Sequence, residues 1–201
     1  MASSQKLSGK RVAILATDGV EQVELAEPRA ALDEAGAKTT LIAPKAGKIK
    51  GWQHDHWGEE FPVDLTLDRA SPDDFDALML PGGVMNPDRL RMDDRAVKFV
   101  KAMADAGKPI AAICHGPWML VEADVVRHRS VTSWPSLETD LRNAGADWSN
   151  QEVVTDMGIV TSRKPDDIPA FNRKMVEEFA EGVHHRTAAP AHAPEHTLAS
   201  R

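Results

Sequence analysis

Short, mainly apolar segments alternate along this chain with longer segments in which apolar residues recur at helical spacing. The short segments cover residues 11–17, 38–43, 77–80 and 110–113. Such runs are typical of strands that are buried on both faces of a parallel sheet. Residues 152–161 predict two further strands on either side of a glycine.

The longer segments predict helices, several of which end at a glycine. Residues 137–143 predict a short helix of this kind. Residues 48–67 contain two glycines and a proline, which predict a small hairpin or an irregular excursion. In the three longer helices, the positions expected to face the sheet are Val23, Ala26 and Ala30, then Val97, Val100, Met103 and Ala104, and finally Ile168, Phe171, Met175 and Phe179.

This alternation predicts the fold class. Strands that alternate with helices form an α/β three-layer sandwich, with a mostly parallel central sheet and helices on both of its faces. Ligands of such folds bind outside the carboxyl ends of the strands. The loops over residues 18–21, 81–88 and 114–117 each follow a predicted strand. We therefore expect the functional residues in these loops.

The length of 201 residues is typical of one domain. We expect that α/β domain over residues 10–182. Residues 1–9 are expected to form a flexible N-terminus. Residues 183–201 are dominated by Ala, Pro and His, a composition that predicts a disordered tail.

Charge and composition exclude several classes of function. The 24 Lys and Arg against 31 Asp and Glu give a formal charge of -7, so the chain lacks the basic field that binds nucleic acid or anionic lipid. No apolar stretch approaches the roughly 18 residues of a membrane span, and the N-terminus does not resemble a secretory signal. The single cysteine cannot form an intramolecular disulfide. We expect a soluble cytoplasmic protein without nucleic-acid or membrane partners, whose ligand is a small molecule or a peptide.

Cys114 is the strongest candidate for chemistry. It stands between a predicted strand and a predicted helix, where a sharp turn lifts a nucleophilic side chain above the sheet. A helix N-terminus at this place favours the thiolate, which predicts a lowered pKa for the thiol. The alternative is a buried and inert cysteine, which is the common state of a free cysteine.

Glu21 follows the first predicted strand and is expected at the same sheet edge, where its carboxyl group can contact the Cys114 sulfur. A glutamate beside a thiolate tends to hold its proton and can donate it. The alternative is a solvated carboxylate at a helix start, which is how we interpret Glu24 and Glu27.

Gly82 and Gly83 permit close approach of the backbone, so their loop is expected to direct amides at a developing oxyanion together with the amide of His115. His115 is the candidate base, provided that its ring folds back toward the sulfur. The acid that orients it is either Asp88 or a residue of a second chain.

Other residues carry weaker signals. His54, Asp55 and His56 resemble metal ligands but lack a third partner at a recognisable spacing, so we expect no metal site and no cofactor. Trp118 and Trp134 lie near predicted strand ends and are expected to line the pocket. Trp residues in general offer anchors for an interface between subunits.

Three motifs occur in order: Asp18-Gly19-Val20-Glu21, Leu80-Pro81-Gly82-Gly83 and Ala112-Ile113-Cys114-His115-Gly116-Pro117. Together they resemble the PfpI family of intracellular cysteine peptidases and general stress proteins, which is part of the superfamily of the Parkinsonism-associated deglycase. Residues 161–167 are similar to the stress-protein branch. The resemblance covers about Lys10 to Gly182 and implies a class I glutamine amidotransferase-like, flavodoxin-like fold.

The resemblance also implies roles for residues. Cys114 is the expected nucleophile, Glu21 the carboxyl group at its sulfur, His115 the base, and Gly83 with His115 the oxyanion hole. In the peptidase branch, an acid from a neighbouring subunit completes the triad. Asp88 lies near the matching position, although its loop is one residue longer here. The family forms dimers or hexamers, so we expect a homo-oligomer.

Three functions follow as hypotheses. The first is a stress-related cysteine hydrolase that acts on peptides or on glycated, methylglyoxal-derived carbonyl substrates. The second is a redox-sensing or chaperone-like protein whose Cys114 is oxidised rather than catalytic. The third is a binding module that uses the same pocket without chemistry. A His115 ring that reaches the sulfur favours the first, and a ring that points away favours the second.

Overall fold

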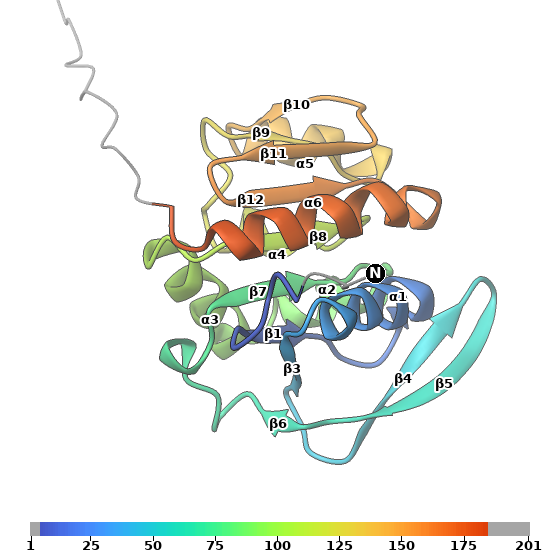
Figure 1. Ribbon diagram of the computed structural model, residues 1–201. Coiled ribbons are helices and arrows are strands. Elements are labelled where there is room, and N and C mark those ends of the chain that lie inside the picture. The colour runs from blue at the N-terminus through green and yellow to red at the C-terminus, as the bar shows by residue number, and fades with distance from the viewer. Residues whose placement is uncertain (1–4, 185–201) are drawn as a thin grey trace, which may run out of the picture.

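The computed structural model describes residues 5–184 (Figure 1). The strands of its central sheet are β1 (Arg11–Leu15), β3 (Lys38–Ala43), β6 (Leu65–Thr66), β7 (Ala77–Leu80), β8 (Ile110–Ile113), β11 (Val153–Asp156) and β12 (Ile159–Ser162). They form a seven-stranded sheet in the order β11-β12-β8-β7-β1-β3-β6. Neighbouring strands are parallel except for β11 and β12, which are antiparallel. The mostly parallel sheet is therefore confirmed.

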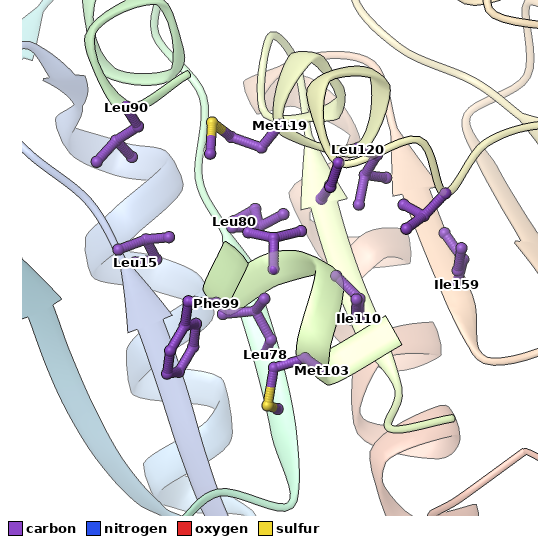
Figure 2. Close-up of a cluster of buried hydrophobic side chains, with 14 of the residues drawn as sticks. Leu15, Leu78, Leu80, Leu90, Phe99, Met103, Ile110, Met119, Leu120 and Ile159 are labelled. Carbon is purple, nitrogen blue, oxygen red and sulfur yellow. The ribbon is translucent and has the colours of Figure 1, made fainter. Parts of the chain in front are cut away.

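Helices cover both faces of this sheet. One face carries α1 (Gln22–Glu34) and α6 (Ile168–Glu181), which lie side by side in Figure 1. The other carries α2 (Met85–Leu90), α3 (Asp94–Asp105), α4 (Pro117–Glu122) and α5 (Glu138–Asn143). Figure 2 shows the apolar layer on this second face, where Phe99 and Met103 of α3 pack on sheet residues such as Leu78. This arrangement is the expected three-layer sandwich.

Smaller elements lie around the sheet. The expected excursion is an antiparallel hairpin of β4 (Lys48–Gln53) and β5 (His56–Pro62), and β4 also pairs with β2 (Val20–Glu21). The hairpin projects from the body of the molecule in Figure 1. The remaining elements are β9 (Ser130–Val131), which pairs with β10 (Asp147–Trp148), and the short 3-10 helices η1 (Pro72–Asp74), η2 (Pro135–Leu137) and η3 (Pro165–Asp167).

The buried face of α1 differs from the predicted one. The helix buries Glu24, Leu25, Pro28 and Leu32, while Ala26 and Ala30 are exposed and Val23 is only partly buried. The prediction followed small apolar residues, whereas the larger side chains bury more surface and so determine the rotation of the helix. The predicted face of α6 is confirmed, because its four apolar residues are all buried. In α3, Val100 and Met103 are buried, and Val97 and Ala104 pack partly buried against the same core.

The packed part of the chain begins and ends outside the expected limits of 10–182. Leu7 is fully buried and its amide donates to the Ala35 carbonyl at 2.9 Å, so residues 5–9 are not a flexible arm. At the other end, the His184 amide donates to the Gly107 carbonyl at 2.8 Å. The rest of the expected tail, residues 185–201, and residues 1–4 lie outside the described part of the chain. Within residues 5–184, no helix is long and apolar enough to cross a membrane.

Candidate active site

Cys114 occupies a sharp turn between β8 and α4. Its backbone has φ of 61°, in a region that side chains rarely adopt, and its side chain is 7% exposed. Two residues on, a Cβ on Gly116 would lie 2.5 Å from the Leu80 carbonyl oxygen, so glycine is required for the turn to pass over β7. A strained backbone that presents a nucleophilic side chain at a strand end is typical of active sites.

The carboxyl group beside Cys114 belongs to Glu24 and not to Glu21. Glu24 is fully buried, its Oε2 accepts a hydrogen bond of 2.9 Å from the Gly82 amide, and its carboxyl group is close enough to the Cys114 thiol for each group to shift the pKa of the other. Glu21 ends β2 before α1 begins, is half-buried, and lines the mouth of the cavity near His54. The prediction for Glu21 as the sulfur contact, and for Glu24 as a solvated carboxylate, was wrong because the first turn of α1 directs Glu24 inward.

The site raises the pKa of both partners of this contact. Burial raises the pKa of the Glu24 carboxyl group to about 8, and the nearby Glu21 adds to the shift. Burial and the charge of an ionised Glu24 raise the pKa of the Cys114 thiol, while the amides of Gly83 and His115 act in the opposite direction. The expected lowering by a helix N-terminus is therefore outweighed, because α4 is short and the thiol is buried. A protonated Glu24 removes the repulsion and can donate to the sulfur.

The His115 ring folds back onto the nucleophile. Its Nδ1 lies 3.2 Å from Cys114 Sγ, which is within hydrogen-bond distance for sulfur. Burial lowers the pKa of His115 to about 4, so the imidazole is neutral around pH 7. With its proton on Nε2, the ring accepts the thiol hydrogen at Nδ1. The geometry required of a general base is therefore present.

The sulfur faces a cavity of about 340 Å³. Its walls come from the start of α1, the segments after β7 and β8, the hairpin, the segment between β9 and η2, and the loop after β12. They consist of Glu21, Glu24, Trp52, His54, Gly83, Val84, Met85, Cys114, His115, Trp134 and Pro165. Trp134 thus lines the pocket as predicted, whereas Trp118 lies behind His115 and contacts its ring at 5.2 Å between centroids.

The two glycines after β7 allow their loop to pack closely against the residues around Cys114 and at the start of α1. A Cβ on Gly82 would lie 2.5 Å from Glu24 Oε2 and 2.8 Å from Cys114 Cβ. Gly83 has φ of 76°, and a Cβ there would lie 2.6 Å from the Glu21 amide nitrogen. The amides of Gly83 and His115 are both directed at the sulfur. They are therefore placed to donate to an oxygen that develops next to it.

Other candidates lie apart from the sulfur. Asp88 is exposed on α2 and is not part of the cavity wall, so within one chain it does not orient His115. His54, Asp55 and His56 do not converge: in the part of the chain that the structure describes, the group of three spaced for a metal is Glu178, Glu181 and His184. The hairpin residues instead contribute His54 and Trp52 to the cavity wall.

Comparison with known proteins agrees with this geometry. Residues 10–178 match the DJ-1/PfpI family. General stress protein 18 of Bacillus subtilis (strain 168) is 46% identical over 168 residues, which cover 83% of this chain and 95% of that protein. Protein/nucleic acid deglycase 2 of Escherichia coli (strain K12) is 44% identical over 167 residues, covering 82% of this chain and 95% of its own length.

A solved structure agrees as well. Drosophila melanogaster DJ-1beta has a TM-score of 0.78 and 28% identity, and the match covers 85% of this chain and 90% of that one. The sequence match, the fold and the set of motifs at one sheet edge lead to the same conclusion: this chain belongs to the DJ-1/PfpI family.

Proposed function

We propose that this protein is a stress-related cysteine hydrolase that removes small, dicarbonyl-derived adducts, such as those of methylglyoxal, from amines or thiols. The observation that carries the proposal is the position of Cys114 Sγ, which has a neutral base at 3.2 Å on one side and a buried carboxyl group on the other. The relatives described above, which carry the names of a stress protein and a deglycase, support the same class of activity.

The chemistry requires no external oxidant. His115 Nδ1 takes the thiol proton while Sγ bonds to the adduct carbon, and that proton leaves with the displaced amine. A proton shift between the two former dicarbonyl carbons turns the sulfur adduct into a thioester of a hydroxy acid. Water then cleaves the S–C bond and restores the thiol. In sum, adduct and water give amine and hydroxy acid.

Backbone and carboxyl groups stabilise the charge that develops in these steps. The amides of Gly83 and His115 are directed at the sulfur and can donate to an adjacent oxyanion. Glu24 holds a proton near neutral pH because burial raises its pKa to about 8. It can therefore donate to the sulfur, or to an oxygen bonded to it, where a carboxylate would repel both.

The cavity favours a small substrate over an extended peptide. Its volume of about 340 Å³ lies at the lower end of the range of roughly 300 to 1,000 Å³ for small-molecule pockets. Trp52 and Trp134 both contribute to its wall. Peptide cleavage is the second activity to test, and Asp88 of a second copy is the acid to examine for it, in a dimer or hexamer.

The redox alternative is less well supported. A His115 ring that points away from the sulfur would favour the redox hypothesis, whereas Nδ1 lies 3.2 Å from Sγ. Such a contact favours turnover.

The test measures release of amine from a methylglyoxal–amine adduct, with free methylglyoxal and an unstructured peptide as parallel substrates. Wild type, Cys114→Ala and His115→Ala are compared after circular dichroism has shown each to be folded. We expect wild-type turnover of the adduct, loss in Cys114→Ala and a reduction of about 100-fold or more in His115→Ala. Cleavage of the peptide alone would replace the proposed substrate class. No turnover of any substrate would overturn the hydrolase.

A further inference from the structure

His115 needs a group that fixes its ring, and no carboxylate of the described chain supplies this directly. Within residues 5–184, the hydrogen bond of the imidazole is the one between Nδ1 and Cys114 Sγ. Asp88 is too far out on α2 to line the site. A side chain with two free torsions would lose this alignment unless its surroundings restrict it.

Two indole rings restrict it instead. Trp118 meets the imidazole edge to face, with ring centroids 5.2 Å apart and an interplanar angle of 62°. Trp134 stacks on it at 6.0 Å and 24°. His115 is only 8% exposed between them. Aromatic pairs with these geometries are attractive and orient both rings.

Trp118 is itself anchored at its far end. Its Nε1–H donates a hydrogen bond of 2.8 Å to Asp140 Oδ2 on α5. The Arg91 guanidinium lies over the indole at 5.6 Å from its centroid, and Arg91 is held by Glu122 at 2.9 Å. The indole is therefore fixed by an acceptor at its edge and a cation at its face.

Asp140, which anchors Trp118, and Trp134, which stacks on His115, belong to one continuous segment, residues 134–140. The Trp134 amide donates to the Cys114 carbonyl at 2.9 Å, which ties the segment to the nucleophile turn. From there η2 leads directly into α5, which carries Asp140. The two supports of the His115 ring are thus coupled through residues 134–140.

We propose that Asp140 is a positioning residue that acts through the Trp118 indole to hold His115 Nδ1 toward Cys114 Sγ. Within one chain, this support acts where no carboxylate is bonded directly to the histidine. The proposal deepens the proposed function and rests on it for the kinetic part of its test.

The variants are Asp140→Ala, Asp140→Asn and Trp118→Phe, with Glu138→Ala as the matched control. Glu138 lies on the same helix and pairs with Arg142 at 2.9 Å, so its loss removes an acid from α5 without touching Trp118. Trp118→Phe keeps an aromatic ring but loses the N–H. Asp140→Asn keeps an acceptor oxygen for that N–H.

Two readouts are measured: kcat and KM on the methylglyoxal–amine adduct, and the rate at which iodoacetamide alkylates Cys114. We expect Asp140→Ala and Trp118→Phe to lower kcat and the alkylation rate by about threefold to tenfold, the worth of one hydrogen bond, with KM nearly unchanged. Asp140→Asn and Glu138→Ala should remain near wild type.

The alkylation arm separates this proposal from the proposed function. If the wild type shows no turnover but Asp140→Ala still slows alkylation, the hydrolase fails and the positioning role stands. Equal alkylation rates in Asp140→Ala, Glu138→Ala and wild type would overturn the positioning role. So would a change in KM alone.

Discussion

The two sides of the Cys114 sulfur are built differently. On the carboxyl side, Glu24 is fully buried and bonded directly to the Gly82 amide at 2.9 Å. On the imidazole side, His115 is held by packing against Trp118 and Trp134. Glu24 is fixed by the backbone of a sheet loop, and His115 by two indole side chains, one from α4 and the other from the residue before η2.

The surroundings shift the pKa values of the two groups in opposite directions. Burial raises the pKa of Glu24 to about 8 and lowers the pKa of His115 to about 4. Between these values both groups are neutral, so the site contains a proton donor and a proton acceptor beside the same sulfur. Titratable groups whose pKa values are pushed apart in this way mark acid and base roles.

The largest loss of turnover is expected from Gly82→Ala, which alters the carboxyl side of the site. The added Cβ would lie 2.5 Å from Glu24 Oε2, 2.7 Å from the Ile113 carbonyl oxygen and 2.8 Å from Cys114 Cβ. Backbone and site atoms surround it, so the loop must shift and turnover should fall by about 100-fold or more. Steady-state kinetics check this.

Gly51→Ala is the control for that variant. Its Cβ would meet the Gln22 and Phe61 side chains at 3.2 Å, away from the sulfur, and activity should stay near wild type. Retained activity in Gly82→Ala would show that the close approach of the two loops is not needed.

A smaller effect is expected on stability as a function of pH. The folded protein keeps the Glu24 proton up to about pH 8, whereas the unfolded chain releases it near its ordinary pKa of 4.5. The unfolded state is therefore favoured as the pH rises, and this one group lowers the free energy of unfolding by at most about 1.4 kcal/mol per pH unit.

Glu24→Gln removes this dependence and leaves the contribution of His115 in place. Denaturant unfolding at several values between about pH 5 and pH 8 should therefore show wild type losing stability relative to Glu24→Gln as the pH rises. Parallel curves for the two proteins would contradict a buried, protonated Glu24.

The smallest effect is a decrease in kcat expected from Trp134→Ala, which alters the imidazole side of the site. Loss of the stacked ring removes one of the two aromatic contacts of His115, while the T-shaped contact with Trp118 remains. A decrease of about tenfold in kcat should follow, the worth of one aromatic pair. Trp134→Phe retains a ring and should recover most of the rate; equal loss in both variants would assign Trp134 to substrate contact.

Much of this architecture could be predicted from the sequence. The apolar runs predict β3, β7 and β8 at the positions that the structure shows. Cys114 is predicted at the turn because a strand and a helix flank it directly. These features are local, so neighbouring residues determine them.

The features that could not be predicted depend on helix rotation and on distant segments. Leu25, Pro28 and Leu32 carried the signal for the true inner face of α1, and that face places Glu24 inside. The approach of Asp140 to Trp118 joins α5 to α4 and has no local signal. Neither the cavity wall formed by the hairpin nor the burial of Leu7 follows from sequence spacing.

The most direct test of the central claim is the rate of Cys114 alkylation at pH 7 in wild type, Glu24→Ala and Glu24→Gln, with Glu27→Gln, an exposed position on the same helix, as the control. If Glu24 is protonated and donates to the sulfur, Glu24→Ala should slow alkylation, since the thiolate loses a donor. Glu24→Gln, which retains an N–H donor, and Glu27→Gln should stay close to wild type. Faster alkylation in Glu24→Ala would contradict the account, because it would show that Glu24 is an ionised carboxylate that opposes the thiolate.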